Sequence, residues 1–248
     1  MSPSRPGPFP VLATTAFAVA ISFASPAIAD LGEAPFNRMI LFEELDYGFN
    51  NGDNPLSWDA TSWVGGDWNR IWFKTDGEMA TSDPEVDGEA QLLYSRLSAP
   101  FWELQFGLRG DLAAAANASP QGRGHLVLGL EGLAPYWFEV EPAIFVSHKG
   151  DVSARLRATY DLFITQRLIA HSSFEMNAAI QSVPEFGVGA GFNDIELGLR
   201  LGYQLARELT PYVGVSWNQA FAETARFRQA AGNAASDLQG VAGLRLWF

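Results

Sequence analysis

Ile195-Glu196-Leu197-Gly198-Leu199-Arg200-Leu201-Gly202-Tyr203-Gln204-Leu205 alternates between apolar residues and residues that are charged, polar or glycine. Successive side chains of a β-strand point to opposite faces, so this period of two predicts a strand with one apolar and one polar face. The same period recurs at 102–111 and at 155–162. In water, the apolar faces of many such strands would form a continuous exposed patch, which soluble monomers avoid. The pattern therefore favours a sheet whose apolar face is covered by lipid.

About twelve segments of roughly ten residues show this alternation, and turn residues separate them, as in transmembrane β-barrels. We therefore predict an all-β fold, a transmembrane antiparallel up-and-down barrel. The predicted strands are 36–48, 57–64, 68–79, 86–97, 101–112, 121–133, 136–148, 151–164, 168–181, 191–205, 211–222 and 236–248. Segment 57–64 is short, and ten strands are the alternative count because single-chain bacterial barrels have an even number.

The connections between these segments alternate in length. The long ones are 50–56, 80–85, 113–120, 182–190 and 223–235, and the short ones are 65–66, 98–100, 134–135, 165–167 and 207–210. Bacterial barrels have short periplasmic turns and longer outer loops. This alternation orients the predicted barrel, with the hairpin at 149–151 as one short outer exception.

The chain has 248 residues with 16 Lys and Arg, 28 Asp and Glu and no Cys, for a formal net charge of −12. A negative chain without a basic stripe repels phosphate backbones, so nucleic acid is not an expected partner. Without cysteine, the fold gains no disulfide cross-links. Stability must then come from hydrogen-bonded secondary structure, packing or a membrane.

Residues 1–29 have the composition of a secretory signal peptide. They carry one charged residue, Arg5, then a mostly apolar run at 11–21 and the small-residue end Ala27-Ile28-Ala29. This pattern predicts cleavage after Ala29, and a membrane anchor is the alternative. The predicted organisation is a signal peptide at 1–29, a short N-terminal segment at 30–35 and a barrel domain at 36–248.

A barrel with lipid outside must turn its charged residues inward, because an unpaired charge in hydrocarbon is costly. This predicts a lumen lined by carboxylates and by Arg and Lys side chains, forming either an occluded plug of ion pairs or a narrow cation-favouring path. Aromatic residues near the strand ends suit the girdles at the membrane interfaces, or they pack inside the lumen. They are Trp58, Trp63, Tyr94, Trp102, Tyr136, Trp137, Tyr203, Tyr212 and Trp247.

The last strand ends on Phe248, as in the C-terminal assembly signal of bacterial outer-membrane proteins. Several sequence blocks, in order, resemble the copper-resistance protein B family: Trp63-Val64-Gly65-Gly66-Asp67, Leu93-Tyr94-Ser95-Arg96, Gly132-Leu133-Ala134-Pro135-Tyr136-Trp137-Phe138, Tyr160-Asp161-Leu162, Thr165-Gln166-Arg167-Leu168, Gly198-Leu199-Arg200-Leu201, Pro211-Tyr212-Val213-Gly214-Val215 and Gly243-Leu244-Arg245-Leu246-Trp247-Phe248. The resemblance spans roughly residues 36–248.

The resemblance implies a barrel in the outer membrane of Gram-negative bacteria that serves copper homeostasis and resistance. It implies copper ions as the bound or transported species, with outer-membrane lipid and periplasmic copper-handling proteins as partners, and we expect a monomer. Many members carry a Met- and His-rich segment before the barrel. Here residues 30–36 contain neither Met nor His. Because Cu(I) selects thioether and imidazole ligands, this departure weakens the metal assignment but not the barrel.

Four lumen residues are candidate metal ligands. Alternation places His171 and Glu175 on one inward face, and His125 and Glu131 on another. A histidine and a carboxylate can bind a divalent ion, or the same side chains can pack the lumen as hydrogen-bonded pairs.

We do not expect an enzyme. His171 and Ser173 share a strand without forming a positioned dyad, and no G-x-S-x-G or H-E-x-x-H pattern occurs. A small channel or structural barrel without a metal role is the main alternative. A barrel lipid hydrolase is the less favoured one.

Overall fold

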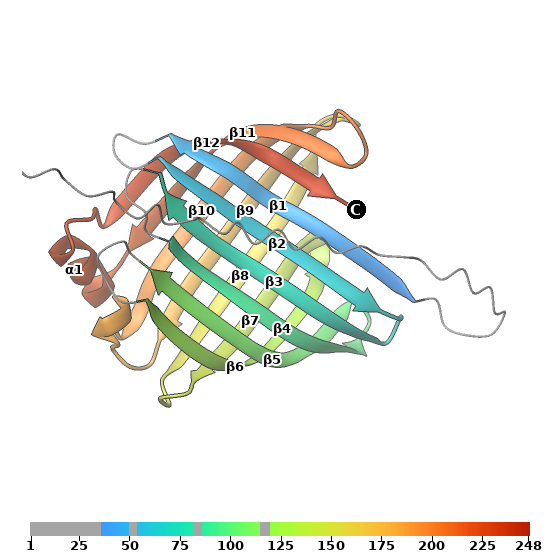
Figure 1. Cartoon of the computed structure of the whole chain (residues 1–248). Coiled ribbons are helices and arrows are strands. Elements are labelled where there is room, and N and C mark those ends of the chain that lie inside the picture. Colours follow the sequence, from blue (N-terminus) through green and yellow to red (C-terminus); the bar gives the residue numbers. More distant parts are fainter. Residues whose placement is uncertain (1–35, 50–53, 82–85, 115–119) are drawn as a thin grey trace, which may run out of the picture. The chain divides into compact units, whose positions relative to one another are not determined.

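The computed structural model describes residues 36–49, 54–81, 86–114 and 120–248. These residues form a closed antiparallel barrel in which each strand pairs with the next and β1 pairs with β12 (Figure 1). The twelve strands are β1 Asn37–Phe49, β2 Pro55–Gly65, β3 Asn69–Ala80, β4 Val86–Ala99, β5 Trp102–Ala114, β6 Gln121–Ala134, β7 Phe138–Ser147, β8 Val152–Phe163, β9 Leu168–Ala179, β10 Gly191–Tyr203, β11 Leu209–Ala220 and β12 Ser236–Trp247. The predicted barrel and strand count are confirmed.

The structure differs from the prediction in strand β2 and in three of the connections. β2 begins at Pro55 and has 11 residues, so the segment predicted as short pairs along its full length with β1 and β3. The long connection expected at 223–235 contains a helix, α1 (Ala222–Ala230), and single turns of 3-10 helix occur at η1 (Pro135–Trp137) and η2 (Pro184–Phe186). The predicted signal peptide and the segment 30–35 lie outside the described residues. Among those that are described, no helix is long and apolar enough to cross a membrane.

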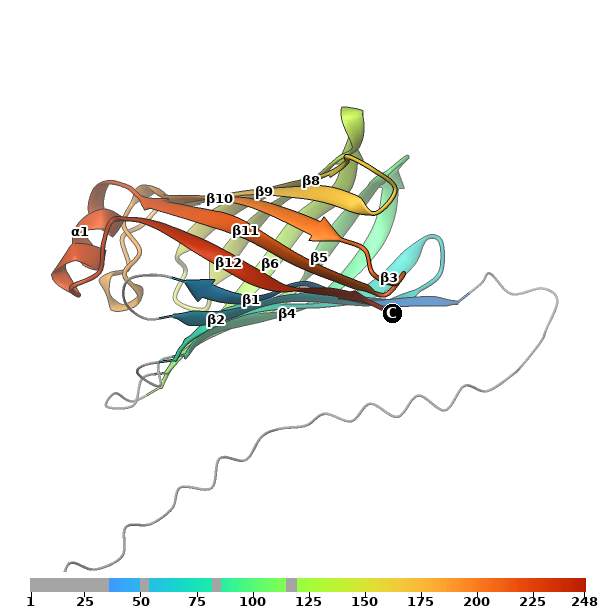
Figure 2. The same cartoon turned by 90° about the horizontal axis from the view of Figure 1, so that it is seen from above.

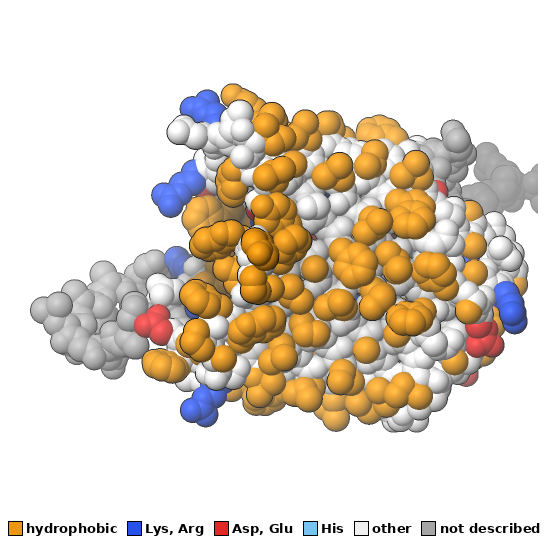
Figure 3. Space-filling model, turned by 180° about the vertical axis from the view of Figure 1, so that it is seen from behind, with side chains coloured by type: hydrophobic (Ala, Val, Ile, Leu, Met, Phe, Trp, Pro, Cys, Tyr) orange, Lys and Arg blue, Asp and Glu red, His pale blue; other side chains and the backbone are white. Residues whose placement is uncertain are grey.

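The two faces of each strand divide as the alternation predicts. On β10, Leu199 is 54% exposed on the outside, whereas the neighbouring Arg200 is 4% exposed and points inward. Apolar side chains cover the outer surface of the barrel seen in Figure 3. A closed barrel pairs all its strand edges, and an apolar outer face is what a bilayer solvates.

The interior also holds a small apolar cluster. Trp72, Leu93, Val127 and Phe145 are buried inside the barrel, and Trp63 and Ala143 pack against them. Trp72 pairs with Leu93 and Val127 with Phe145 across neighbouring strands. The same four strands also carry charged lumen residues, so the cluster is an apolar patch within a mostly charged interior.

The aromatic residues near the strand ends divide between the two predicted locations. Tyr94, Tyr136, Trp137, Tyr203 and Trp247 are exposed, as interface residues are. Tyr212 is buried, and Trp63 packs against the inner cluster. Tyr212 is inside because its hydroxyl accepts a hydrogen bond from the Leu45 backbone N–H across the barrel seam.

The two ends of the barrel have different connections. The turns at 66–68, 100–101, 135–137, 164–167 and 204–208 lie at the end that also holds the C-terminus, here called the short-turn end. Helix α1 lies at the opposite, long-loop end (Figure 2). The Gly189 N–H donates to Thr224 Oγ1 at 2.9 Å, which ties α1 to the loop before β10.

Candidate functional site in the barrel lumen

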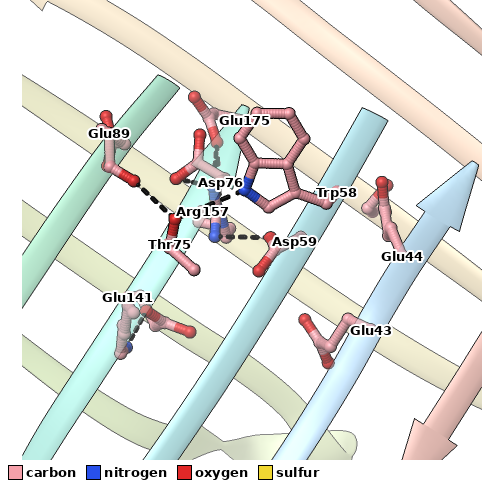
Figure 4. Close-up of polar contacts among 12 residues, drawn as sticks. Glu43, Glu44, Trp58, Asp59, Thr75, Asp76, Glu89, Glu141, Arg157 and Glu175 are labelled. Carbon is pink, nitrogen blue, oxygen red and sulfur yellow. Dashed lines mark hydrogen bonds and ion pairs between the residues drawn. The ribbon is translucent and has the colours of Figure 1, made fainter. Parts of the chain in front are cut away.

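Arg157 on β8 joins opposite walls of the barrel. Its guanidinium lies 3.0 Å from Asp59 Oδ2 on β2 and 2.9 Å from Glu175 Oε2 on the neighbouring β9 (Figure 4). Five strands lie between β8 and β2 in either direction around the closed sheet. The Arg157–Asp59 pair therefore spans the full width of the lumen.

A second arginine of β8 joins the same network. Arg155 donates two hydrogen bonds of 2.8 Å, one to each carboxylate oxygen of Glu89 on β4. Arg109 on β5 lies 2.5 Å from the same carboxylate, and the Gln91 side chain donates to it at 2.7 Å. Bidentate, charge-assisted contacts of this kind fix geometry as well as charge. Glu89 is thus an anchor for two cations from different walls.

Lys74 on β3 contacts two glutamates of the neighbouring strands β6 and β7. Its Nζ is 2.8 Å from Glu131 Oε2 on β6 and 2.5 Å from Glu141 Oε2 on β7. Gln105 Nε2 donates to the same Glu131 oxygen at 2.5 Å. The Lys74 ammonium also lies 5.2 Å from the centroid of the Trp72 ring. Each of its close partners is an acceptor or an electron-rich face.

Arg200 on β10 pairs across the seam of the barrel. Its Nη2 lies 2.5 Å from Glu44 Oε2 and 2.8 Å from Asp46 Oδ2, both on β1. The register of β1 shifts between Phe42 and Glu44, which marks a β-bulge. A bulge places consecutive residues on the same side of a strand, and Glu43 and Glu44 both reach lumen arginines.

At the short-turn end, His171 and Asp161 form a cross-strand pair. His171 Nδ1 lies 2.6 Å from Asp161 Oδ1, and Arg245 Nη1 lies 3.0 Å from Asp161 Oδ2. Arg245 also approaches Glu43 at 3.4 Å. At the same end but on another part of the sheet, Arg70 of β3 lies 2.5 Å from Glu103 of β5.

Two spaces inside the barrel lie beside these ion pairs. The central cavity measures about 30 Å³ and is bordered by Asp59, Lys74, Asp76, Glu141, Arg155 and Arg157, among others. This is room for about one water molecule. The vestibule, at the short-turn end, measures about 480 Å³ and is lined by Asp67, Arg70, Leu97, Phe101, Glu103, Glu131, Leu133 and Glu139. Ion pairs therefore cross the middle of the lumen, while Asp76 and Glu141 beside them keep 32% and 28% of their side-chain surface exposed.

The four predicted ligand residues face the lumen but bind different partners. His171 pairs with Asp161, Glu175 with Arg157, and Glu131 with Lys74. His125 Nδ1 is 3.5 Å from Asp111 Oδ2. Over the described ranges, no three or more His, Cys, Asp and Glu side chains are grouped so that they could hold a metal ion. The metal-ligand role of these residues stays a prediction.

Alternation did not predict four acidic residues of this network. Glu43, Glu44 and Asp46 lie around the bulge of β1, which interrupts the period of two. Asp59 lies on β2, the strand that was predicted to be short. The consecutive glutamates of Phe42-Glu43-Glu44-Leu45 are a signal that could have identified the bulge, because a regular strand would turn one of them toward lipid.

Comparisons with known proteins agree with the sequence blocks. The family described as "Copper resistance protein B precursor (CopB)" matches residues 36–248. "Copper resistance protein B" of Escherichia coli is 38% identical over 216 residues, which cover 87% of this chain and 71% of that protein. "Copper resistance protein B homolog" of Pseudomonas syringae pv. tomato is 32% identical with the same coverage.

Solved barrels were also found. The KdgM porin aligns with a TM-score of 0.47 at 10% identity, covering 85% of this chain and 99% of the porin. The outer-membrane expressed OmpT of Vibrio cholerae aligns with a TM-score of 0.37 at 7% identity, covering 86% and 96%.

Proposed function

Because the chain belongs to the copper resistance protein B family, we propose that it is an outer-membrane barrel that binds copper ions or controls their passage. Residues 1–29 would direct its export. The cargo in this proposal is a cation, and the observation that carries it is the excess of carboxylates inside the barrel. Asp67, Glu103, Glu131 and Glu139 line the vestibule with Arg70 as the one basic residue of that lining. Rings of carboxylates favour cations over anions.

The lumen supplies mostly oxygen donors. Carboxylate oxygens suit Cu(II) less specifically than imidazole nitrogen does, and they suit Cu(I) poorly. His171 and Asp161, hydrogen-bonded at the short-turn end, combine an imidazole with a carboxylate. We propose this pair as the first copper contact inside the barrel, in place of the His171–Glu175 pair.

The second candidate function is that of a structural barrel without a metal role. It is favoured by the closed centre, where Arg157 and Asp59 join opposite walls, and by the absence of a metal-holding group among the described residues. In this alternative the ion pairs serve only to fill and stabilise the lumen.

Copper tolerance separates the two functions. A strain lacking the gene is grown in graded copper, with zinc and silver as controls, and is complemented with the wild type and with His171→Ala. We expect the deletion to change copper tolerance and cell-associated copper selectively, and His171→Ala to complement only partly. Unchanged copper tolerance would favour the structural barrel.

A further inference from the structure

Lys74 lies at the boundary between the two internal spaces of the barrel. Lys74 and Glu141 border the central cavity, whereas Glu131 lines the vestibule at the short-turn end. The contact of 2.8 Å between Lys74 Nζ and Glu131 Oε2 therefore joins a residue that borders the central cavity to one that lines the vestibule. The side chain of Lys74 is 9% exposed, so its ammonium is held inside the protein.

The surroundings of this ammonium are those of a cation site. Glu131 and Glu141 each place a carboxylate oxygen within 2.8 Å of Nζ, and they come from the adjacent strands β6 and β7, three and four positions along the sheet from β3. Gln105 donates to Glu131 and so holds its carboxylate in place. Hard cations prefer such oxygen donors. The lysine ammonium supplies the positive charge at the end of a flexible four-carbon chain, and rotation of this chain can move the ammonium away from the two carboxylates.

The backbone beside this site is irregular. The pairing of β6 with β7 runs from His125 to Gly129, stops, and resumes at Gly132 in the same register. Leu130 and Glu131 therefore lie in a gap of the ladder. The residues opposite the gap include Pro142, which has no N–H to donate to a ladder. The wall that carries both glutamates therefore lacks the regular ladder found along most of the barrel.

We propose that Lys74 is a tethered cation occupying a cation-binding site formed by Glu131 and Glu141, and that withdrawal of the lysine opens this site to a free small cation. The wild-type barrel is then closed because its own ammonium fills the site between the vestibule and the central cavity. This inference goes beyond the proposed function, since it concerns small cations in general and does not require copper.

Ion conductance in planar bilayers tests the proposal with K⁺ as the probe. Lys74→Met removes the charge and keeps an unbranched side chain, and a KCl gradient then gives the selectivity. We expect this variant to conduct, with a reversal potential shifted toward the K⁺ equilibrium potential. Lys74→Arg retains the charge and is expected to stay closed. The triple variant Lys74→Met/Glu131→Gln/Glu141→Gln has the same opening without the carboxylates, and its cation selectivity should be lost.

The controls make each outcome decisive. Arg123→Met removes an equally buried cation, paired with Asp151, that borders neither space. Heat-modifiable mobility on detergent gels reports folding, and the charge-balanced Lys74→Met/Glu141→Gln variant replaces Lys74→Met if the latter fails to fold. The proposal is overturned if the folded Lys74→Met variant, or its charge-balanced replacement, conducts no more than Arg123→Met. It is equally overturned if the triple variant is as cation-selective as Lys74→Met. Because copper is absent, failure here leaves the copper proposal standing.

Discussion

At the scale of single residues, the lumen depends on charges that satisfy one another. Arg157 has partners on three other strands, the most distant being Asp76 at 3.9 Å, and loss of its guanidinium would leave Asp59 and Glu175 with less compensation inside the protein. Removing one member of a buried ion pair is costly because the remaining charge stays desolvated. An exposed pair is different, since water solvates both partners whether or not they meet.

Arg157→Met should therefore destabilise the barrel by about 3–5 kcal/mol. The matched control is Lys149→Met at the rim, where Lys149 and Glu185 pair at 2.7 Å with side chains 49% and 65% exposed. We expect that substitution to cost less than about 1 kcal/mol. Urea unfolding of the two variants in lipid vesicles measures both effects. Equal decreases in the free energy of unfolding would show that the cross-barrel pair stabilises the barrel no more than the exposed pair does.

Close packing between strands gives a second residue-scale prediction. A Cβ at Gly214 would lie against the Leu199 carbonyl oxygen and within 2.9 Å of Arg200 Cα, whereas a Cβ at Gly110 would meet nothing within 4 Å. Overpacking against backbone costs about 1–3 kcal/mol. Gly214→Ala should thus lower the stability of the folded barrel, and Gly110→Ala should not. Heat-modifiable mobility over a temperature series compares the two, and similar transition temperatures would contradict the prediction.

At the scale of elements, the β7–β8 hairpin at the long-loop end is held by a titratable side chain. The Ser147 hydroxyl donates to Asp151 at 2.9 Å, and Arg123 donates to it at 2.7 Å. The hydrogen bond from Ser147 and the nearby arginine lower the pKa of Asp151 below its ordinary value of 3.8. A lowered folded-state pKa means that the charged carboxylate stabilises the hairpin above pH 3.8, and that this contribution is lost as pH falls through the lower folded-state pKa.

We expect the hairpin to loosen below about pH 4 while the strands of the barrel stay paired. Hydrogen exchange of residues 147–152, followed from neutral to acidic pH, measures this. Asp151→Asn should remove the acid dependence and leave faster exchange at neutral pH. If the variant and the wild type show the same acid dependence, another group controls the hairpin.

At the scale of the whole molecule, the sequence was enough for the architecture and not for the interior. Alternation predicted twelve strands because lipid outside and charge inside are imposed on every strand, as Leu199 and Arg200 show. It could not pair Arg157 with Asp59, since two strands on opposite walls of a barrel have no relation in sequence. The β1 bulge and helix α1 were also missed, because both interrupt the period on which the prediction rests.

The same interior leads to a prediction for the intact barrel. Twelve strands can enclose an open lumen, but here pairs between distant strands cross it, as Arg157 with Asp59 and Arg155 with Glu89 do. The central cavity between these pairs measures about 30 Å³, which is room for about one water molecule and is too small for a sugar. Proteoliposomes containing the wild-type barrel should therefore not swell in isotonic maltose, whereas liposomes with an open porin do. Swelling at a porin-like rate would mean that the ion pairs separate in the membrane, and the lumen would then be a channel whose selectivity is set by the carboxylates of the vestibule.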